Sequence, residues 1–229
     1  MKKLLSILIL IIAVAGTATA QCEYYVVSNG SEWEMETYNA KGKLTARNQQ
    51  KVTQFNATAT GFNAMINSIM LNDKGKETMK GDLEMKCENG TLHFDMRNFV
   101  SEDQMKAYSS YETKIESKSL ETPSKLSIGQ TLPDGSITIS AVGSPLPMKM
   151  TIVITNRKVE SQESITTPAG TFACYKITSL MNMQSQMGVN MSFSFTSTEW
   201  LAPAVGTVRS ETYRNGKLNG YTILTKRKG

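Results

Sequence analysis

The chain has 229 residues, of which 40% are hydrophobic, and it carries 25 Lys and Arg against 20 Asp and Glu, a formal net charge of +5. This length suits one domain with a sizeable core. The charges are interspersed, so the mild basicity indicates no nucleic-acid partner. One histidine and three cysteines without a CxxC spacing give no pattern of a zinc or thioredoxin-like site.

The first twenty residues are typical of a secretory signal peptide. Lys2 and Lys3 precede a short apolar run, and Ala18 and Ala20 occupy the small-residue positions of a cleavage site. We expect cleavage after Ala20, which leaves residues 21–229 as a single β-rich domain in the periplasm or at the cell surface. No later run approaches the roughly 20 apolar residues of a spanning helix, so we expect no membrane span in the mature chain.

Two alternatives to simple cleavage stay open, an uncleaved N-terminal anchor and a lipoprotein modified on Cys22. Against the second, Gln21 stands where a lipobox would have a small residue. In an oxidising compartment two of the three cysteines, Cys22, Cys87 and Cys174, can pair, and the third stays free or bonds to another molecule.

Alternation of apolar and polar residues with period two dominates the mature chain and predicts strands. Asn89-Gly90 is the preferred centre of a two-residue hairpin turn. The register it sets separates two faces. The apolar face pairs Cys87 with Leu92, Met85 with Phe94 and Leu83 with Met96, and the polar face pairs Lys86 with His93 and Glu84 with Asp95.

Further turns and one helix complete the predicted fold. Turn signals recur at Lys41-Gly42, Lys74-Gly75, Pro133-Asp134-Gly135, Pro168-Ala169-Gly170 and Asn215-Gly216. Short turns between strands imply antiparallel pairing. A capping box at 101–104 predicts a helix of about three turns that ends near Glu112. The expected fold is mainly β: an antiparallel sheet or sandwich, or an incompletely closed β-barrel, with one short helix.

Catalytic residues are not evident. His93 and Asp95 share a strand face and could act as a base and its orienter, but the hairpin register places Cys87 on the opposite face. No Gly-x-Ser-x-Gly elbow is present. We therefore expect no enzyme, no catalytic residue, no cofactor and no metal site.

Methionine is abundant, with 14 in the chain, and it concentrates in strands that also carry phenylalanine. Such flexible side chains suit a cavity that accepts apolar partners. We predict a turn within 186–188 and a lipid-binding wall formed by Met148, Met150, Met181, Met183, Met191, Phe193 and Phe195. Two alternatives remain, a dry core built from the same residues and a Cu(I) site built from their thioethers.

A family resemblance covers nearly the whole mature chain and is sharpest from Gly129 onward. The segments 129–134, 154–160, 166–177 and 199–213 resemble the TapB-like family of exported bacterial β-rich proteins. The resemblance implies secretion and a β-rich fold, and it supplies no catalytic residue. Within the segment 199–213, Ala204 stands where we would expect glycine in similar sequences.

From these observations we expect an exported envelope protein without catalysis, which binds an apolar, lipid-like ligand or another envelope protein. The alternatives are a structural or assembly accessory protein and, third, a methionine-rich copper-binding protein. An enclosed cavity would favour a carried ligand, whereas a filled core with an exposed apolar patch would favour a protein partner.

Overall fold

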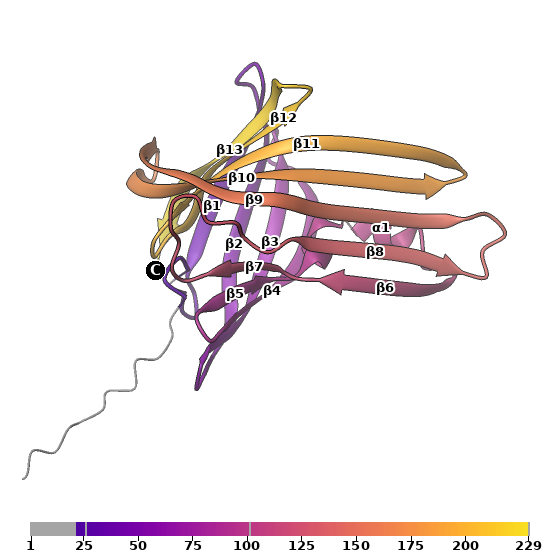
Figure 1. Cartoon of the computed structure of the whole chain (residues 1–229), viewed down its shortest axis with the longest axis horizontal. Coiled ribbons are helices and arrows are strands. Elements are labelled where there is room, and N and C mark those ends of the chain that lie inside the picture. The colour runs from indigo at the N-terminus through magenta and orange to yellow at the C-terminus, as the bar shows by residue number, and fades with distance from the viewer. Residues whose placement is uncertain (1–21, 26, 101, 229) are drawn as a thin grey trace, which may run out of the picture.

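The computed structural model describes residues 22–25, 27–100 and 102–228. Within these residues the chain forms one sheet of 13 strands, in the order β6-β8-β9-β10-β11-β12-β13-β1-β2-β3-β4-β5-β7 (Figure 1). The predicted signal peptide lies outside the described residues. No helix in the described part of the chain is long and apolar enough to cross a membrane.

Two short helices, η1 and α1, lie between β5 and β6 in the chain. The elements are β1 (Glu32–Asn39), β2 (Leu44–Thr58), β3 (Gly61–Asn72), β4 (Glu77–Glu88), β5 (Thr91–Phe94), η1 (Met96–Phe99), α1 (Glu102–Lys106), β6 (Glu112–Lys118), β7 (Leu120–Pro123), β8 (Gly135–Val142), β9 (Met148–Thr167), β10 (Gly170–Met187), β11 (Val189–Ala202), β12 (Gly206–Arg214) and β13 (Lys217–Lys228).

The strands β6 and β7 bring the two ends of the sheet together. They are separated by Ser119 alone, yet β6 pairs with β8 at one end of the sheet and β7 pairs with β5 at the other. The sheet therefore curves round until it is nearly closed. This confirms the prediction of an antiparallel sheet that approaches a barrel.

A buried arginine bridges this seam. Arg157 of β9 is 3% exposed, and its guanidinium donates to the carbonyl oxygens of Glu121 at 2.5 Å and Pro133 at 2.9 Å and to Thr122 Oγ1 at 3.1 Å. Burial lowers the pKa of this guanidinium. Because these acceptors lie in and after β7, Arg157 links β9 to the opposite end of the sheet.

The predicted turns are confirmed except at Pro133-Asp134-Gly135, where the chain makes no turn and Gly135 already begins β8. Both residues of Asn89-Gly90 and of Asn215-Gly216 have positive φ, as a type I′ turn requires. The β4–β5 register also matches the prediction for Met85 with Phe94, Lys86 with His93 and Cys87 with Leu92.

The two outer pairs of the same hairpin were predicted wrongly, because β5 ends at Phe94. The Asp95 carboxylate accepts a hydrogen bond from the Arg97 backbone at 2.8 Å and caps η1. Met96 then enters the core within η1 and does not pair with Leu83, and Asp95 does not pair with Glu84.

The predicted helix is shorter than expected. α1 ends at Lys106 instead of near Glu112, and β6 begins at Glu112. The Ser109 hydroxyl donates to the Lys106 carbonyl at 2.7 Å, a bond that competes with helix continuation. Ser101 of the predicted capping box lies outside the described residues.

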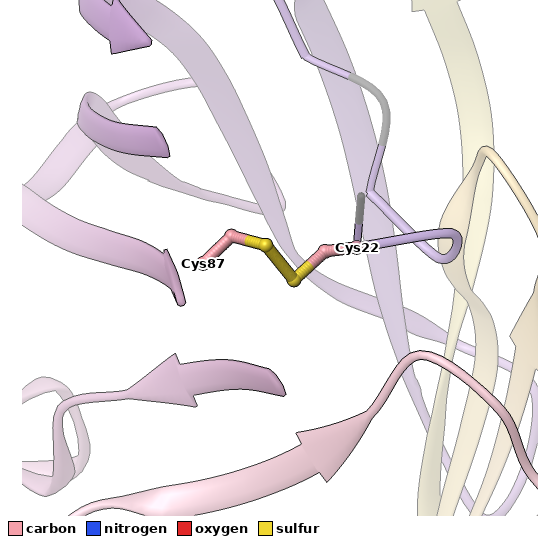
Figure 2. The surroundings of a disulfide bond; sticks show 2 residues. All are labelled: Cys22 and Cys87. Carbon is pink, nitrogen blue, oxygen red and sulfur yellow. A yellow bond between two sulfur atoms is a disulfide. The ribbon is translucent and has the colours of Figure 1, made fainter. Parts of the chain in front are cut away.

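A disulfide ties the start of the described chain to the sheet. Cys22 is bonded to Cys87 of β4 across 65 residues (Figure 2). Both cysteines are buried in a cluster with Phe62 and Leu92. Cys174 is the free cysteine of the described residues, and it is buried in a separate cluster.

Candidate functional site

All seven residues of the predicted wall share one face of β9, β10 and β11, because directly paired residues of antiparallel strands point to the same side. Read across these strands, the rows on this face are Ile154-Met181-Phe195, Ile152-Met183-Phe193, Met150-Ser185-Met191 and Met148-Met187-Val189. We call these twelve residues the methionine wall. Ser185 is its one polar member.

The opposite face of the same strands is polar. A cleft of about 420 Å³ is lined mainly by residues of this polar face, together with Ser185 and Met191 of the methionine wall: Lys149, Thr151, Gln184, Ser185, Gln186, Asn190, Met191 and Ser192. The two faces differ because polar and apolar residues alternate along all three strands. The predicted turn within 186–188 is confirmed, since β10 ends at Met187 and Gly188 has a φ of +78°.

Burial falls steeply across the methionine wall. On β9, Ile152 is 1% and Met150 is 4% exposed, because Met96 of η1 and Tyr108 after α1 pack in the same cluster. At the β10–β11 turn, by contrast, Val189 is 70% exposed and Met191 is 48% exposed. Figure 1 shows β9, β10 and β11 extending together beyond the end of β12, with α1 behind them. The wall is therefore core on one side and open apolar surface on the other.

A second, larger cleft lies elsewhere and does not include the wall. It has a volume of about 780 Å³ and is lined by β1, β2 and the end of β13. Its carboxylates are engaged by neighbouring cations: Glu32 Oε1 lies 2.7 Å from Lys51 Nζ, and Glu34 Oε1 lies 3.1 Å from Lys226 Nζ. Of the seven predicted residues, Met191 alone lines one of these two clefts.

The pairing also brings thioethers together. Met148 lies opposite Met187, the adjacent row contains Met150 and Met191, and Met183 lies one row further along. Soft thioether sulfurs are ligands suited to Cu(I). Among the described residues, no three His, Cys, Asp or Glu side chains are grouped so that they could hold a metal ion.

The side chains considered for catalysis are not assembled. His93 Nδ1 lies 3.6 Å from Glu121 Oε1, while Asp95 is engaged by Arg97. Cys87 is in the disulfide. Burial, followed by the nearby Glu163 carboxylate, raises the pKa of the Cys174 thiol to about 11. Cys174 therefore stays a protonated thiol at neutral pH.

Sequence reasoning missed a row of aromatic and cationic side chains on the other face of the sheet. The cations Lys176 and Arg209 lie 5.5 and 5.7 Å from the Trp200 ring centre, and Arg209 also lies 5.0 Å from that of Tyr221. Tyr221 stacks on Tyr38 at 5.1 Å. A signal was available in the repeated Glu-Thr-Tyr triplets that precede the turns of the β1–β2 and β12–β13 hairpins.

Comparison with known proteins identifies relatives of the whole fold. A family described as DUF3108-like matches residues 28–224. No curated protein matches the chain.

Two crystal structures share the architecture. One is a candidate exported protein with a YmcC-like fold from Bacteroides fragilis NCTC 9343, with 23% identity and a TM-score of 0.71 over 90% of this chain and 99% of that one. The other is a candidate lipoprotein from Parabacteroides distasonis ATCC 8503, with 24% identity and a TM-score of 0.72 over 90% of this chain and 98% of that one. At these identities the likeness establishes a common fold.

Proposed function

The chain belongs to the DUF3108-like family, and from the methionine wall we propose that it is an exported binding protein of the bacterial envelope, without catalysis, which holds an apolar, lipid-like ligand against that wall. The resemblance of the chain to the TapB-like family, sharpest from Gly129 onward, is part of this proposal.

Export is supported by three observations. The Ala18-x-Ala20 pattern favours signal-peptide cleavage. The Cys22–Cys87 disulfide is of a kind that persists in oxidising compartments. Both structural neighbours are described as exported or lipoprotein candidates. We place the mature chain in the periplasm or at the cell surface.

The disulfide also favours simple cleavage over lipidation. A lipoprotein carries its diacylglyceryl group on the sulfur of the cysteine at the new N-terminus. Here the Cys22 sulfur is bonded to Cys87, so it is not available for that thioether. This chain would therefore differ from the neighbour described as a lipoprotein candidate.

The burial gradient across the methionine wall carries the ligand proposal. A wall that served only as core would be covered along its whole width, whereas the β11 side leaves Met191 and Val189 about half or more exposed. Exposed contiguous apolar surface marks sites for apolar ligands and for protein partners alike, and the probe assay below distinguishes the two. Covering ~200 Å² of it at ~25 cal/mol per Å² would yield about 5 kcal/mol, from which the association costs must still be subtracted.

Displacement of a fluorescent fatty acid tests this proposal directly. Wild type should bind the probe, and Met191→Glu should weaken binding about tenfold or more, because it places a carboxylate on the wall. The matched control is Ile128→Glu, which alters an equally apolar side chain that is 63% exposed outside the wall. Equal loss in both variants, or no binding by folded wild type, would contradict the proposal.

Copper is the second candidate, and the facing pair Met148 and Met187, with Met150 in the next row and Met183 in the row after that, favours it. Titration with Cu(I) against a competing chelator separates the two functions. Met→Leu changes at these positions should abolish copper binding and preserve probe binding, because leucine keeps the apolar surface and removes the sulfur. If the protein binds neither the fatty-acid probe nor Cu(I), a structural or assembly role with another envelope protein is the remaining proposal.

A further inference from the structure

The strand β11 is longer than its neighbour β12, and its first part has a free edge. The β11–β12 pairs begin at Thr196 with Tyr213, whereas β10 pairs with β11 from Val189 onward. Among the described strands, residues 189–195 therefore hydrogen-bond on the β10 side alone. Their outward N–H and C=O groups can accept another strand.

This edge lacks the charges that normally discourage pairing. Strand β6 and residues 77–84 of β4 also have a partner on one side only. Each of those stretches carries four charged side chains, whereas Val189-Asn190-Met191-Ser192-Phe193-Ser194-Phe195 carries none and contains no proline. The Arg214 guanidinium lies 5.5 Å from the Phe193 ring centre. Natural sheets block edges with charges, proline or bulges, and the β10–β11 register is free of bulges here.

The stretch is also complementary to itself. In an antiparallel pair of two copies centred on Ser192, Met191 lies opposite Phe193, and Val189 lies opposite Phe195. On the other face Asn190 meets Ser194, and the two Ser192 residues meet each other. Apolar side chains thus face apolar ones, polar face polar, and no like charges meet.

We propose that a second copy of this chain pairs with this edge, so that two sheets join antiparallel through residues 189–195 in a twofold-symmetric dimer. The twofold axis runs perpendicular to the sheet, so both methionine walls lie on the same side and become continuous. The exposed Met191 of one copy gains Phe193 of the other as a neighbour. The ligand surface proposed above is then shared by two chains, although the pairing itself does not depend on any ligand.

Oligomeric state measured on the mature chain tests the pairing. Light scattering coupled to gel filtration, at about 10 to 200 µM, should show a concentration-dependent dimer. Ser192→Lys should raise the dimer dissociation constant roughly tenfold, because it places two ammonium groups opposite each other at the twofold axis. Thr196→Lys is the matched control, since Thr196 is also exposed on β11 but is paired on both sides.

A cross-link tests the register. In Ser192→Cys the two new thiols should form an intermolecular disulfide under mild oxidant, because directly paired Cα atoms lie about 4.5 to 5.5 Å apart. The native cysteines do not interfere, since one pair is bonded and Cys174 is buried. Thr196→Cys should stay uncrosslinked.

A chain that is monomeric throughout this range and uncrosslinked through Ser192→Cys would overturn the proposal, and the edge would then serve a strand of a different protein. Probe binding is measured separately on the same samples. Wild type that is monomeric but binds the probe refutes the pairing alone, and wild type that is dimeric but binds no probe refutes the ligand alone.

Discussion

Removal of the Cys22–Cys87 disulfide should lower the free energy of unfolding by about 4 kcal/mol. The bond closes a loop of 65 residues. In the chain-entropy treatment such a loop costs the unfolded state about 14 cal/mol/K, which is about 4 kcal/mol at 25 °C. Both sulfurs lie in a buried cluster, so reduction also leaves two thiols in the space that the bond filled.

Guanidinium chloride unfolding with and without reductant measures this effect. With an m-value of about 5 kcal/mol per molar, the midpoint should fall by ~0.8 M on reduction. Cys174→Ala is the control, because Cys174 takes no part in the bond, and its midpoint should fall equally on reduction. A midpoint that reductant leaves unchanged, or an intact mass with a diacylglyceryl group, would refute the reasoning.

Three further predictions concern other parts of the sheet. Ala204 has a φ of +62° in an exposed turn, a backbone conformation that glycine adopts without strain. Ala204→Gly should therefore raise the free energy of unfolding by about 0.5 to 1 kcal/mol in denaturant titration. A destabilised variant would show that the turn is unstrained. Arg157→Ala should lower the free energy of unfolding by about 3 kcal/mol, because it removes three hydrogen bonds from a buried site. Arg157→Lys should not restore that stability, because lysine lacks the planar fork of donors that reaches all three acceptors. Full stability of either variant would contradict the bridging role. Hydrogen bonds from Tyr38 and Arg47 hold the pKa of Glu36 below its ordinary value of 4.5, so this stabilisation is complete above that pH and is lost as the pH falls below it. The melting temperature of Glu36→Gln should therefore fall less steeply with decreasing pH than that of wild type. Identical pH profiles would contradict a stabilising role for the Glu36 carboxylate.

The local features of the fold were predictable from the sequence because they depend on near neighbours in the chain. Asn89-Gly90 sets its hairpin register through the backbone conformations that Asn and Gly accept. The alternation in Met191, Phe193 and Phe195 likewise assigns them to one face without knowledge of the partner strand.

The features that escaped prediction depend on distant segments. The Asn215-Gly216 turn was predicted, but its position relative to β11 was not: β12 pairs with β11 from Thr196 onward, which leaves residues 189–195 without a second neighbour among the described strands. Tyr108 and Met96, from the segment between β5 and β6, join Met150 in one buried cluster. Neither contact can be read from the residues near it in the sequence. The division of the methionine wall into a buried and an exposed part is therefore visible only in the three-dimensional structure.

Native mass spectrometry of the mature chain, released from its own envelope, tests the central claim most directly. We predict a wild-type species with one bound molecule of acyl-chain mass per chain, and the bare chain for Met191→Glu purified in the same way. Folded wild type that carries no such mass, and takes up none when fatty acid is added, would contradict the account.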